Sequence, residues 1–363
     1  MTGKLALLGK MMDHVHLHGG QGSSQENIAA PPGCGEGPYA GVDSHLRALA
    51  GAAEGFGSAS VGGLHGEVYH VTSLADEGHG TLRDGCKKTE PLWIVFDVSG
   101  TIHVAKNIRV QSYKTIDGRG QRIKITNKGL QLKECEHVII CNLEFERGAG
   151  PDADAIQLKP KSRHVWIDRC TLSDYDDGLI DVTRQSSFVT VSRCHFFNHN
   201  KTMLIGADPK HFEDRCIRVT IHHCFYDGTR QRHPRVRFAK VHLYNNYTRG
   251  WSVYAVCASV ESQVLSQHCI YEAGDKKKGF EYYCEKARDK DHEASGTLRS
   301  ENDLFLNGAQ GHMQGPNQVF GVEEFYSNYT LESADAELMK KIQRIAGWQN
   351  VPRPYELAPH AVI

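Results

Sequence analysis

An internal repeat of short β-branched segments constrains the fold of this chain more than any other feature. Six segments share one pattern, in which a valine stands five positions before a Cys, Asn or Leu, and these valines recur every 22 to 30 residues. Short strands at this period, with no long amphipathic helix between them, are typical of a solenoid of stacked coils. The segments are HVIICNLEF (137–145), HVWIDRCTL (164–172), FVTVSRCHF (188–196), RVTIHHCFY (218–226), KVHLYNNYT (240–248) and the looser VLSQHCIYE (264–272).

The spacing of these strands favours an all-β parallel β-helix over a β-sandwich. A sandwich joins neighbouring strands by hairpins, with turn signals about every ten residues. Here the connecting segments vary in length while the strands stay about one coil apart. We therefore expect the repeated cysteines to stack inside as small fillers, because no CxxC pair favours a metal site. We also expect Asn142 and Asn246 to belong to an asparagine ladder, either inward or in a turn, in which each amide bonds the next coil.

The two ends of the chain differ from the repeats and predict three parts. Residues 1–55 are rich in Gly, Ala and Ser, which predicts a flexible lead followed by a segment that caps the first coil. The β-helix domain is expected over 56–330, with a long charged loop at 275–293. Helical spacing after Ser333, the expected N-cap, predicts that 331–363 hold a helix and a tail.

Composition disfavours several classes of partner. The 42 basic and 43 acidic residues give a net charge of -1, so the whole chain offers no general attraction to nucleic acid or to an anionic membrane. No stretch approaches the roughly 18 apolar residues of a membrane helix. The apolar run in KLALLGK is too short for a secretory signal, so no export signal is visible. An odd count of 11 cysteines suits buried thiols or a reducing compartment better than a disulfide framework.

Two groups of aspartates follow successive repeats. The segments GPDADAIQL and YDDGLIDV carry Asp152, Asp154, Asp176, Asp177 and Asp181. Stacked coils lie about 4.8 Å apart, so aspartates of neighbouring coils can converge on one face. Carboxylates without His or Cys favour a hard cation, and Ca²⁺ accepts irregular geometry better than Mg²⁺. Solvated turn aspartates are the alternative, and the residues alone leave both interpretations open.

A cluster of arginines follows two coils later, in TRQRHPRVRFAKVHLYNN. Arg230, Arg232, Arg235 and Arg237 fall within eight residues. Cations on the same groove as a carboxylate cluster favour an anionic ligand that metal and guanidinium hold together. A polymer with repeating carboxylates fits this description. The proline inside the cluster and the neutral balance elsewhere disfavour a nucleic-acid site.

The motifs resemble those of the pectate lyases of polysaccharide lyase family 1. The resemblance extends from about residue 60 to residue 275 and implies a right-handed parallel β-helix enzyme of pectin degradation, expected to be a monomer. Such an enzyme cleaves (1,4)-α-D-galacturonan by Ca²⁺-dependent β-elimination and releases 4,5-unsaturated oligogalacturonides. Family members are usually secreted to the cell wall, which leaves the compartment of this chain open. The matching segments are WIDRC, YDDGLID, HNKTMLIG, RQRHPRVRFAKVHLYNN, IVFDVSGTI, TIDGRG and SLADEGHGTLRDG.

The same resemblance implies a set of calcium ligands. Asp154, Asp177 and Asp181 match the primary ligands of the family. Asp152 matches a position that joins when substrate brings further calcium. The family usually has WIDH where this chain has WIDRC, so Arg169 places a stronger cation in the coil of the ligands.

The resemblance also implies catalytic roles. Lys201 matches a lysine that grips the substrate carboxylate, Arg232 matches the base that removes the C5 proton, and Arg237 matches its substrate-binding companion. Free arginine stays protonated up to about pH 12. The base therefore needs either a suppressed charge or a hydroxide that it positions, and both predict an alkaline optimum. Arg230 and Arg235 are interpreted as strand-edge or structural charges.

Two alternatives remain open from the sequence. One is a catalytically silent pectin-binding β-helix, which the presence of Lys201, Arg232 and Arg237 disfavours. The other is a hydrolase of the polygalacturonase type, because the tripeptides GHG and RIK and the pair DD all occur. In that family the order is DD, GHG and then RIK, whereas GHG comes first here.

Overall fold

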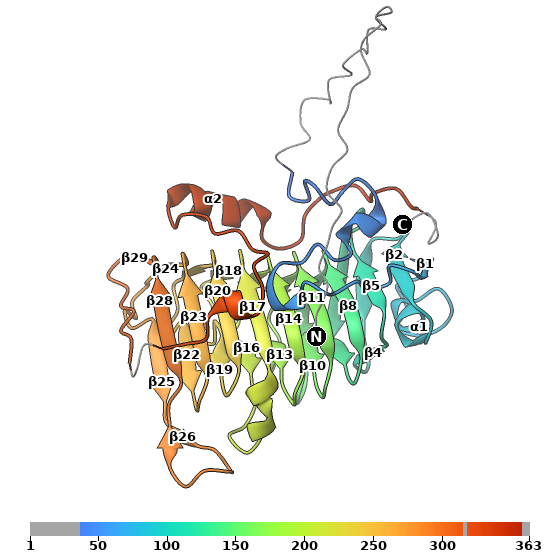
Figure 1. Ribbon diagram of the computed structural model, residues 1–363. Coiled ribbons are helices and arrows are strands. Elements are labelled where there is room, and N and C mark those ends of the chain that lie inside the picture. The colour runs from blue at the N-terminus through green and yellow to red at the C-terminus, as the bar shows by residue number, and fades with distance from the viewer. Residues whose placement is uncertain (1–36, 315–317, 358–363) are drawn as a thin grey trace, which may run out of the picture. The chain divides into compact units, whose positions relative to one another are not determined.

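Each repeat of the sequence forms one coil of a parallel β-helix in the computed structural model, which describes residues 37–314 and 318–357 (Figure 1). The valines of all six repeats are partners in adjoining parallel strands, from Val138 to Val264. The predicted fold is confirmed. Within the described residues the coils build three parallel sheets of ten, nine and eight strands, named sheets A, B and C.

The strands follow the coils in the order A, B, C. Sheet A contains β1 Glu67–Val71, β2 Leu92–Phe96, β5 Lys114–Asp117, β8 Glu136–Cys141, β11 Arg163–Asp168, β14 Ser187–Ser192, β17 Arg218–His222, β20 Lys240–Tyr244, β23 Gln263–Gln267 and β28 Thr297–Glu301. Sheet B contains β3 Gly100–His103, β6 Ile123–Asn127, β9 Glu144–Gly148, β12 Thr171–Ser173, β15 His195–Phe197, β18 Phe225–Asp227, β21 Tyr247–Arg249, β24 Ile270–Glu272 and β29 Leu304–Leu306. Sheet C contains β4 Ile108–Val110, β7 Leu130–Leu132, β10 Ile156–Leu158, β13 Gly178–Val182, β16 Lys201–Ile205, β19 Arg235–Val236, β22 Val256–Ser259 and β25 Phe280–Tyr283.

Strands such as β2 and β11 of sheet A are buried on both faces, which explains their apolar runs. In β11, Val165 and Ile167 belong to the main core inside the solenoid, while Trp166 belongs to a second cluster outside it. The N-terminal segment covers that outer face, because Tyr39 and Leu46 pack in the same outer cluster as Trp166. This segment includes the short 3-10 helices η1 Leu46–Leu49 and η2 Gly55–Gly57.

The described part of the N-terminal segment runs along sheet A, and the capping role expected for residues 1–55 stays a prediction. The backbone N–H groups of Phe56, Gly57 and Gly63 donate to the hydroxyls of Thr220, Thr190 and Thr115, on three strands of that sheet. Helix α1 Leu82–Lys87 lies at the end of the solenoid beside β1, with buried Leu82 and Cys86 in the main core (Figure 1). The predicted flexible lead lies outside the described residues.

The column of small side chains inside the coils contains Cys170, Cys194, Cys224 and Cys269, all buried. These cysteines are the expected fillers. Asn246 shares this column, accepts from Cys224 N at 2.9 Å and donates to Ile221 O at 2.8 Å in the preceding coil. The ten cysteines in the described part of the chain are free thiols.

The predicted ladder of Asn142 with Asn246 is wrong by one position. Asn142 falls in the neighbouring column, at the turn between sheets A and B, where its backbone is left-handed with φ 57°. Asparagine accepts this conformation more readily than most residues. Arg169, Arg193 and His223 occupy the same column with φ values of 48°, 50° and 53°.

Helix α2 Ala336–Ile345 packs on the outer face of sheet B, as expected for a helix outside the solenoid (Figure 1). Leu338 and Ile342 contact Phe225 and Tyr247 of β18 and β21 in one apolar cluster. Its N-cap is Asp335, not the predicted Ser333, because the Asp335 carboxylate accepts from the first free backbone N–H groups of the helix.

The segment 275–293, predicted as a loop, contributes β25 to sheet C and then forms a two-stranded antiparallel hairpin. The hairpin strands are β26 Glu285–Lys286 and β27 Glu293–Ala294. The 3-10 helices η3 Phe212–Cys216 and η4 Val322–Glu324 complete the elements. The described residues include no helix long and apolar enough to cross a membrane. The domain boundaries at 55 and 330 stay a prediction.

Candidate active site

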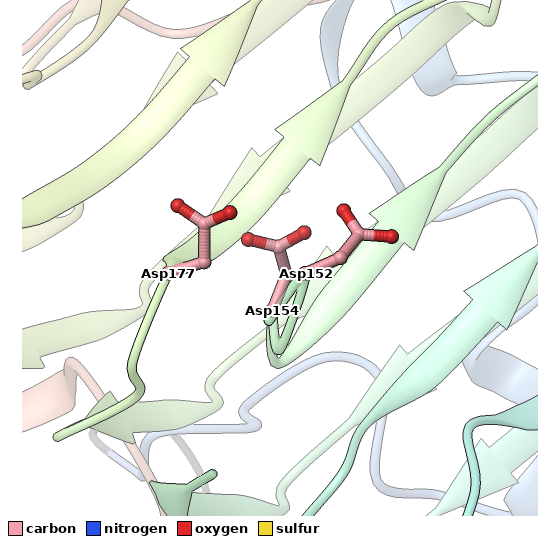
Figure 2. Close-up of side chains that lie close together, drawn as sticks. All are labelled: Asp152, Asp154 and Asp177. Atoms are coloured by element: carbon pink, nitrogen blue, oxygen red, sulfur yellow. The ribbon is translucent and has the colours of Figure 1, made fainter. Parts of the chain in front are cut away.

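The predicted acidic cluster forms where the chain turns from sheet B into sheet C. One carboxylate oxygen from each of Asp152, Asp154 and Asp177 lies within 4.8 Å of the others. Figure 2 shows Asp152 and Asp154 in one turn and Asp177 in the neighbouring coil, with Asp154 between the other two side chains. The coil-to-coil convergence expected from the sequence is therefore present for these three residues.

Asp154 is the best fixed of the three carboxylates. It is buried, and its Oδ1 accepts from the backbone N–H of Gly178 in the next coil at 2.6 Å. Its Oδ2 accepts from Nε2 of Gln157 at 2.7 Å. Burial raises the pKa of Asp154 above its ordinary range, and the nearby Asp177 carboxylate adds to the rise, while both hydrogen bonds oppose it.

Asp181 lies on the outer side of β13, next to this cluster. Gly178 separates the two carboxylates: a Cβ at this glycine would lie 2.7 Å from Asp154 Oδ1 and 2.8 Å from Asp181 Oδ1. Burial raises the pKa of Asp181 well above its ordinary range, with a further contribution from Asp154. Burial penalises the charged form of Asp181, and the negative charge of Asp154 adds to this effect.

Two lysines lie against the rim of the cluster. Lys159 Nζ contacts both oxygens of Asp152, at 2.8 and 3.0 Å. Lys201, at the start of β16, forms an ion pair with Asp177 Oδ1. Because Lys201 is the register partner of Gly178, it stands one coil beyond the aspartates on the same face.

His199 is a residue that sequence reasoning missed. Its Nε2 lies 2.9 Å from the carbonyl oxygen of Asp177 and 3.1 Å from that of Lys201, so this nitrogen carries the proton and donates. Burial lowers the pKa of His199 below its ordinary value. The neutral imidazole thus ties the backbone of two predicted site residues together. The only sequence signal for His199 was its position at the start of the segment HNKTMLIG.

Arg232 lies just before β19, one coil beyond Lys201. Its backbone is left-handed with φ 67°, and its carbonyl accepts from Met203 N at 2.9 Å. Within the described residues its buried Nε has no hydrogen-bond partner. Its positive charge opposes the rise of the Asp181 pKa.

Arg235 and Arg237 share one carboxylate, that of Glu285 in the hairpin strand β26. Arg237 Nε lies 2.7 Å from Glu285 Oε2 and its Nη2 lies 2.8 Å from Oε1, while Arg235 Nη2 lies 2.9 Å from Oε1. Arg237 Nη1 also donates to the carbonyls of Gly206 and Ala207. Glu285 was not predicted, because it comes 48 residues after Arg237 in a charged segment without a motif.

Arg169, expected near the calcium ligands, is held by other partners. It forms an ion pair with Asp168 and donates to the carbonyl of Pro38. Its guanidinium lies 4.1 Å from the centre of the Tyr39 ring. Arg169 therefore serves the contact between the A–B turn and the N-terminal segment.

Comparisons with known proteins agree with this geometry. Residues 98–350 match the family described as pectate lyase. Pectate lyase 1 of Ambrosia artemisiifolia is 35% identical over 319 residues, with 81% of this chain and 80% of that protein covered. Putative pectate lyase 21 of Arabidopsis thaliana is 37% identical, with 72% and 71% covered.

Solved structures show the same architecture. The crystal structure of jun a 1, the major allergen from cedar pollen, has a TM-score of 0.75 and 31% sequence identity, and the match covers 85% of this chain and 99% of that one. A pectate lyase from Bacillus sp. N165 in complex with trigalacturonate has a TM-score of 0.64 with 22% identity, covering 83% and 99%. The second likeness concerns the fold alone.

Proposed function

This chain belongs to the pectate lyase family, and we propose that it cleaves (1,4)-α-D-galacturonan by Ca²⁺-dependent β-elimination. One observation carries the proposal. The acidic cluster, Lys201 and Arg232 lie beside β10, β13, β16 and β19, which are four consecutive strands of sheet C. Acid oxygens and cations on adjoining coils fit a polymer that carries a carboxylate on each sugar.

The residues of the cluster fit a calcium ion. All donors are carboxylate oxygens, which hard cations prefer, and Gly178 keeps the space between Asp154 and Asp181 free of a side chain. The raised pKa values of both carboxyls have the same main cause, burial that penalises the charged form, and neighbouring carboxylates add to it. We therefore propose Asp154, Asp177 and Asp181 as ligands, with Asp152 joining when substrate is present. Ca²⁺ bound there would withdraw charge from the uronate carboxylate.

The side chains supply the rest of the reaction. Lys201 donates to the carboxylate of the uronate that reacts, and so favours the charge that develops as the C5–H bond breaks. Arg232 takes the C5 proton, either as a neutral guanidine or through a hydroxide that it positions. The electron pair of that bond forms the C4–C5 double bond, and the C4–O bond breaks. The departing oxygen takes up a proton, and no water is consumed.

Arg237 contributes through its position. Its guanidinium donates to Glu285 and to the carbonyls of Gly206 and Ala207. These bonds fix the segment that also carries Arg232, and they place a positive charge on the outer face of sheet C. Direct contact with a substrate carboxylate, as the family resemblance implies, requires Glu285 to release this guanidinium. The competition between substrate and Glu285 is thus a property of this site.

The alternatives predict different products. A hydrolase adds one water to each cleaved bond, and a silent binding protein leaves the polymer intact. We would digest trigalacturonate and measure the masses of the products. Elimination gives one unsaturated product that is lighter by one water than the corresponding hydrolysis product, whereas a digest of saturated products alone would refute the lyase.

A further inference from the structure

The cations on the outer face of sheet C differ in what they already hold. Arg235 and Arg237 share Glu285, and the side chain of Arg237 is only 9% exposed. Lys201 is paired with Asp177. These three cations therefore meet a ligand only after giving up a partner.

Arg230, in the turn before β19, differs from these three cations. Its backbone is held on both sides, because its N–H donates to His199 O at 3.0 Å and its carbonyl accepts from Ser252 N and Val253 N at 3.2 and 3.0 Å. Its side chain is exposed. Within residues 37–314 and 318–357 its guanidinium makes no ion pair and no hydrogen bond, so a fixed backbone presents an available cation.

A pocket of about 390 Å³ adjoins this guanidinium. Its walls include Asp174, Asp176, His199 and Arg230, together with Asp177 and Lys201 of the proposed active site. This volume lies within the range of small-ligand pockets, roughly 300 to 1,000 Å³. The pocket therefore continues the proposed active site toward Arg230.

The charges in the pocket select the ligand. Asp174 and Asp176 are exposed, and their oxygens can accept from sugar hydroxyls. Asp176 Oδ2 already accepts from Gly150 N at 2.6 Å. The same two acids repel a carboxylate unless a cation receives it. Arg230 is the one lining cation not already paired with an acid among the described residues.

We propose that this pocket binds a second galacturonate unit of the polymer and that Arg230 holds its carboxylate. The inference rests on the proposed function, because it takes the neighbouring unit to lie against Lys201. It names the substrate more closely: two adjacent unesterified galacturonates. A methyl ester on the second unit removes the charge that a guanidinium binds bidentately.

The test is calorimetric binding of trigalacturonate in the presence of Ca²⁺. All proteins carry Arg232→Lys, which keeps the charge and suppresses turnover, and Arg230→Gln is compared with Arg344→Gln. Arg344 is an exposed arginine on α2, which packs on sheet B. We expect Arg230→Gln to weaken binding about tenfold, the effect of losing a charge-assisted hydrogen bond. Arg344→Gln should bind as its parent does.

Fully methyl-esterified trigalacturonate provides the second arm, in which Arg230→Gln and its parent should bind alike. Equal binding of the acid form by both proteins overturns the inference, and so does an equal loss with the ester. Failure of the proposed function looks different. In that case the wild type forms no unsaturated product. The effect of Arg230→Gln on binding of the acid form still shows whether the pocket binds a galacturonate carboxylate.

Discussion

Gly178→Ala tests whether the spacing of two carboxylates creates the cation site. A Cβ at this position would lie 2.7 Å from Asp154 Oδ1 and 2.8 Å from Asp181 Oδ1, closer than the 3.0 Å that real Cβ atoms keep. Both oxygens must therefore move by a few tenths of an ångström. The backbone φ of Gly178 does not require glycine, so the effect of the substitution is steric.

The expected changes in the free energy of unfolding and in the calcium requirement follow from the movement of the two carboxylates. Both crowded atoms are the ends of rotatable side chains, but a hydrogen bond to a buried carboxylate is lost, so the free energy of unfolding should fall by about 1 to 3 kcal/mol. The carboxylates, however, turn away from their common space, and Asp154 loses its 2.6 Å bond from Gly178 N. Loss of a good ligand position, at about 1.4 to 3 kcal/mol, raises the Ca²⁺ concentration for half-maximal rate roughly ten- to a hundredfold.

The assay is the elimination rate on polygalacturonate across a series of buffered Ca²⁺ concentrations, with thermal unfolding in chelator as the folding control. Gly274→Ala is the matched variant, because a Cβ there meets only backbone atoms of Gly250, none closer than 3.3 Å. It should leave the calcium requirement unchanged. A folded Gly178→Ala protein with the wild-type calcium requirement would refute the reasoning.

Three further predictions concern single carboxylates and the proposed base. Asp177→Asn should raise the calcium requirement of the elimination rate, whereas Asp43→Asn, at an exposed site outside the cluster, should not. Arg232→Lys should lower kcat by about 10² to 10⁴, the usual effect of losing a general base, with the melting temperature unchanged; a near-normal kcat would remove Arg232 from the mechanism. Burial raises the pKa of Asp303 to about 6 from its ordinary value near 4. The folded protein therefore favours the protonated carboxyl. The stability that this protonated form contributes is fully present below about pH 4 and is lost as pH rises through about 6. Asp303→Asn should therefore gain about 1 to 3 kcal/mol over wild type across that interval, measured by thermal unfolding; a constant difference would contradict the assignment.

The solenoid could be predicted from the sequence because its strands and their register follow from a repeat that is visible along the chain. A valine column at one-coil spacing defines both the strands and their register, and the structure pairs Val165 with Val138 and Val189 as that spacing requires. The convergence of Asp154 and Asp177 follows from the same spacing. Residues on successive coils are neighbours whenever the coil length is right.

The features that the sequence did not predict depend on contacts outside the repeat of one coil. Glu285 reaches Arg237 from the hairpin that follows β25, two strands beyond β19 in sheet C. The segment around Tyr39 covers Trp166 on sheet A from the N-terminal part of the chain. The misplaced asparagine ladder has a different cause. Asn142 lies one position earlier in its coil than Asn246 does, in the turn with a left-handed backbone, so the two residues do not share one ladder.

The most direct test is the ultraviolet absorbance of the purified protein acting on polygalacturonate at mildly alkaline pH, first with Ca²⁺ and then with EGTA. Of the possible products, only the unsaturated product of elimination absorbs at the ultraviolet wavelength of this assay. We predict a steady rise with Ca²⁺ that EGTA abolishes and added Ca²⁺ restores. New reducing ends without absorbance, or a rise that EGTA leaves unchanged, would contradict the account.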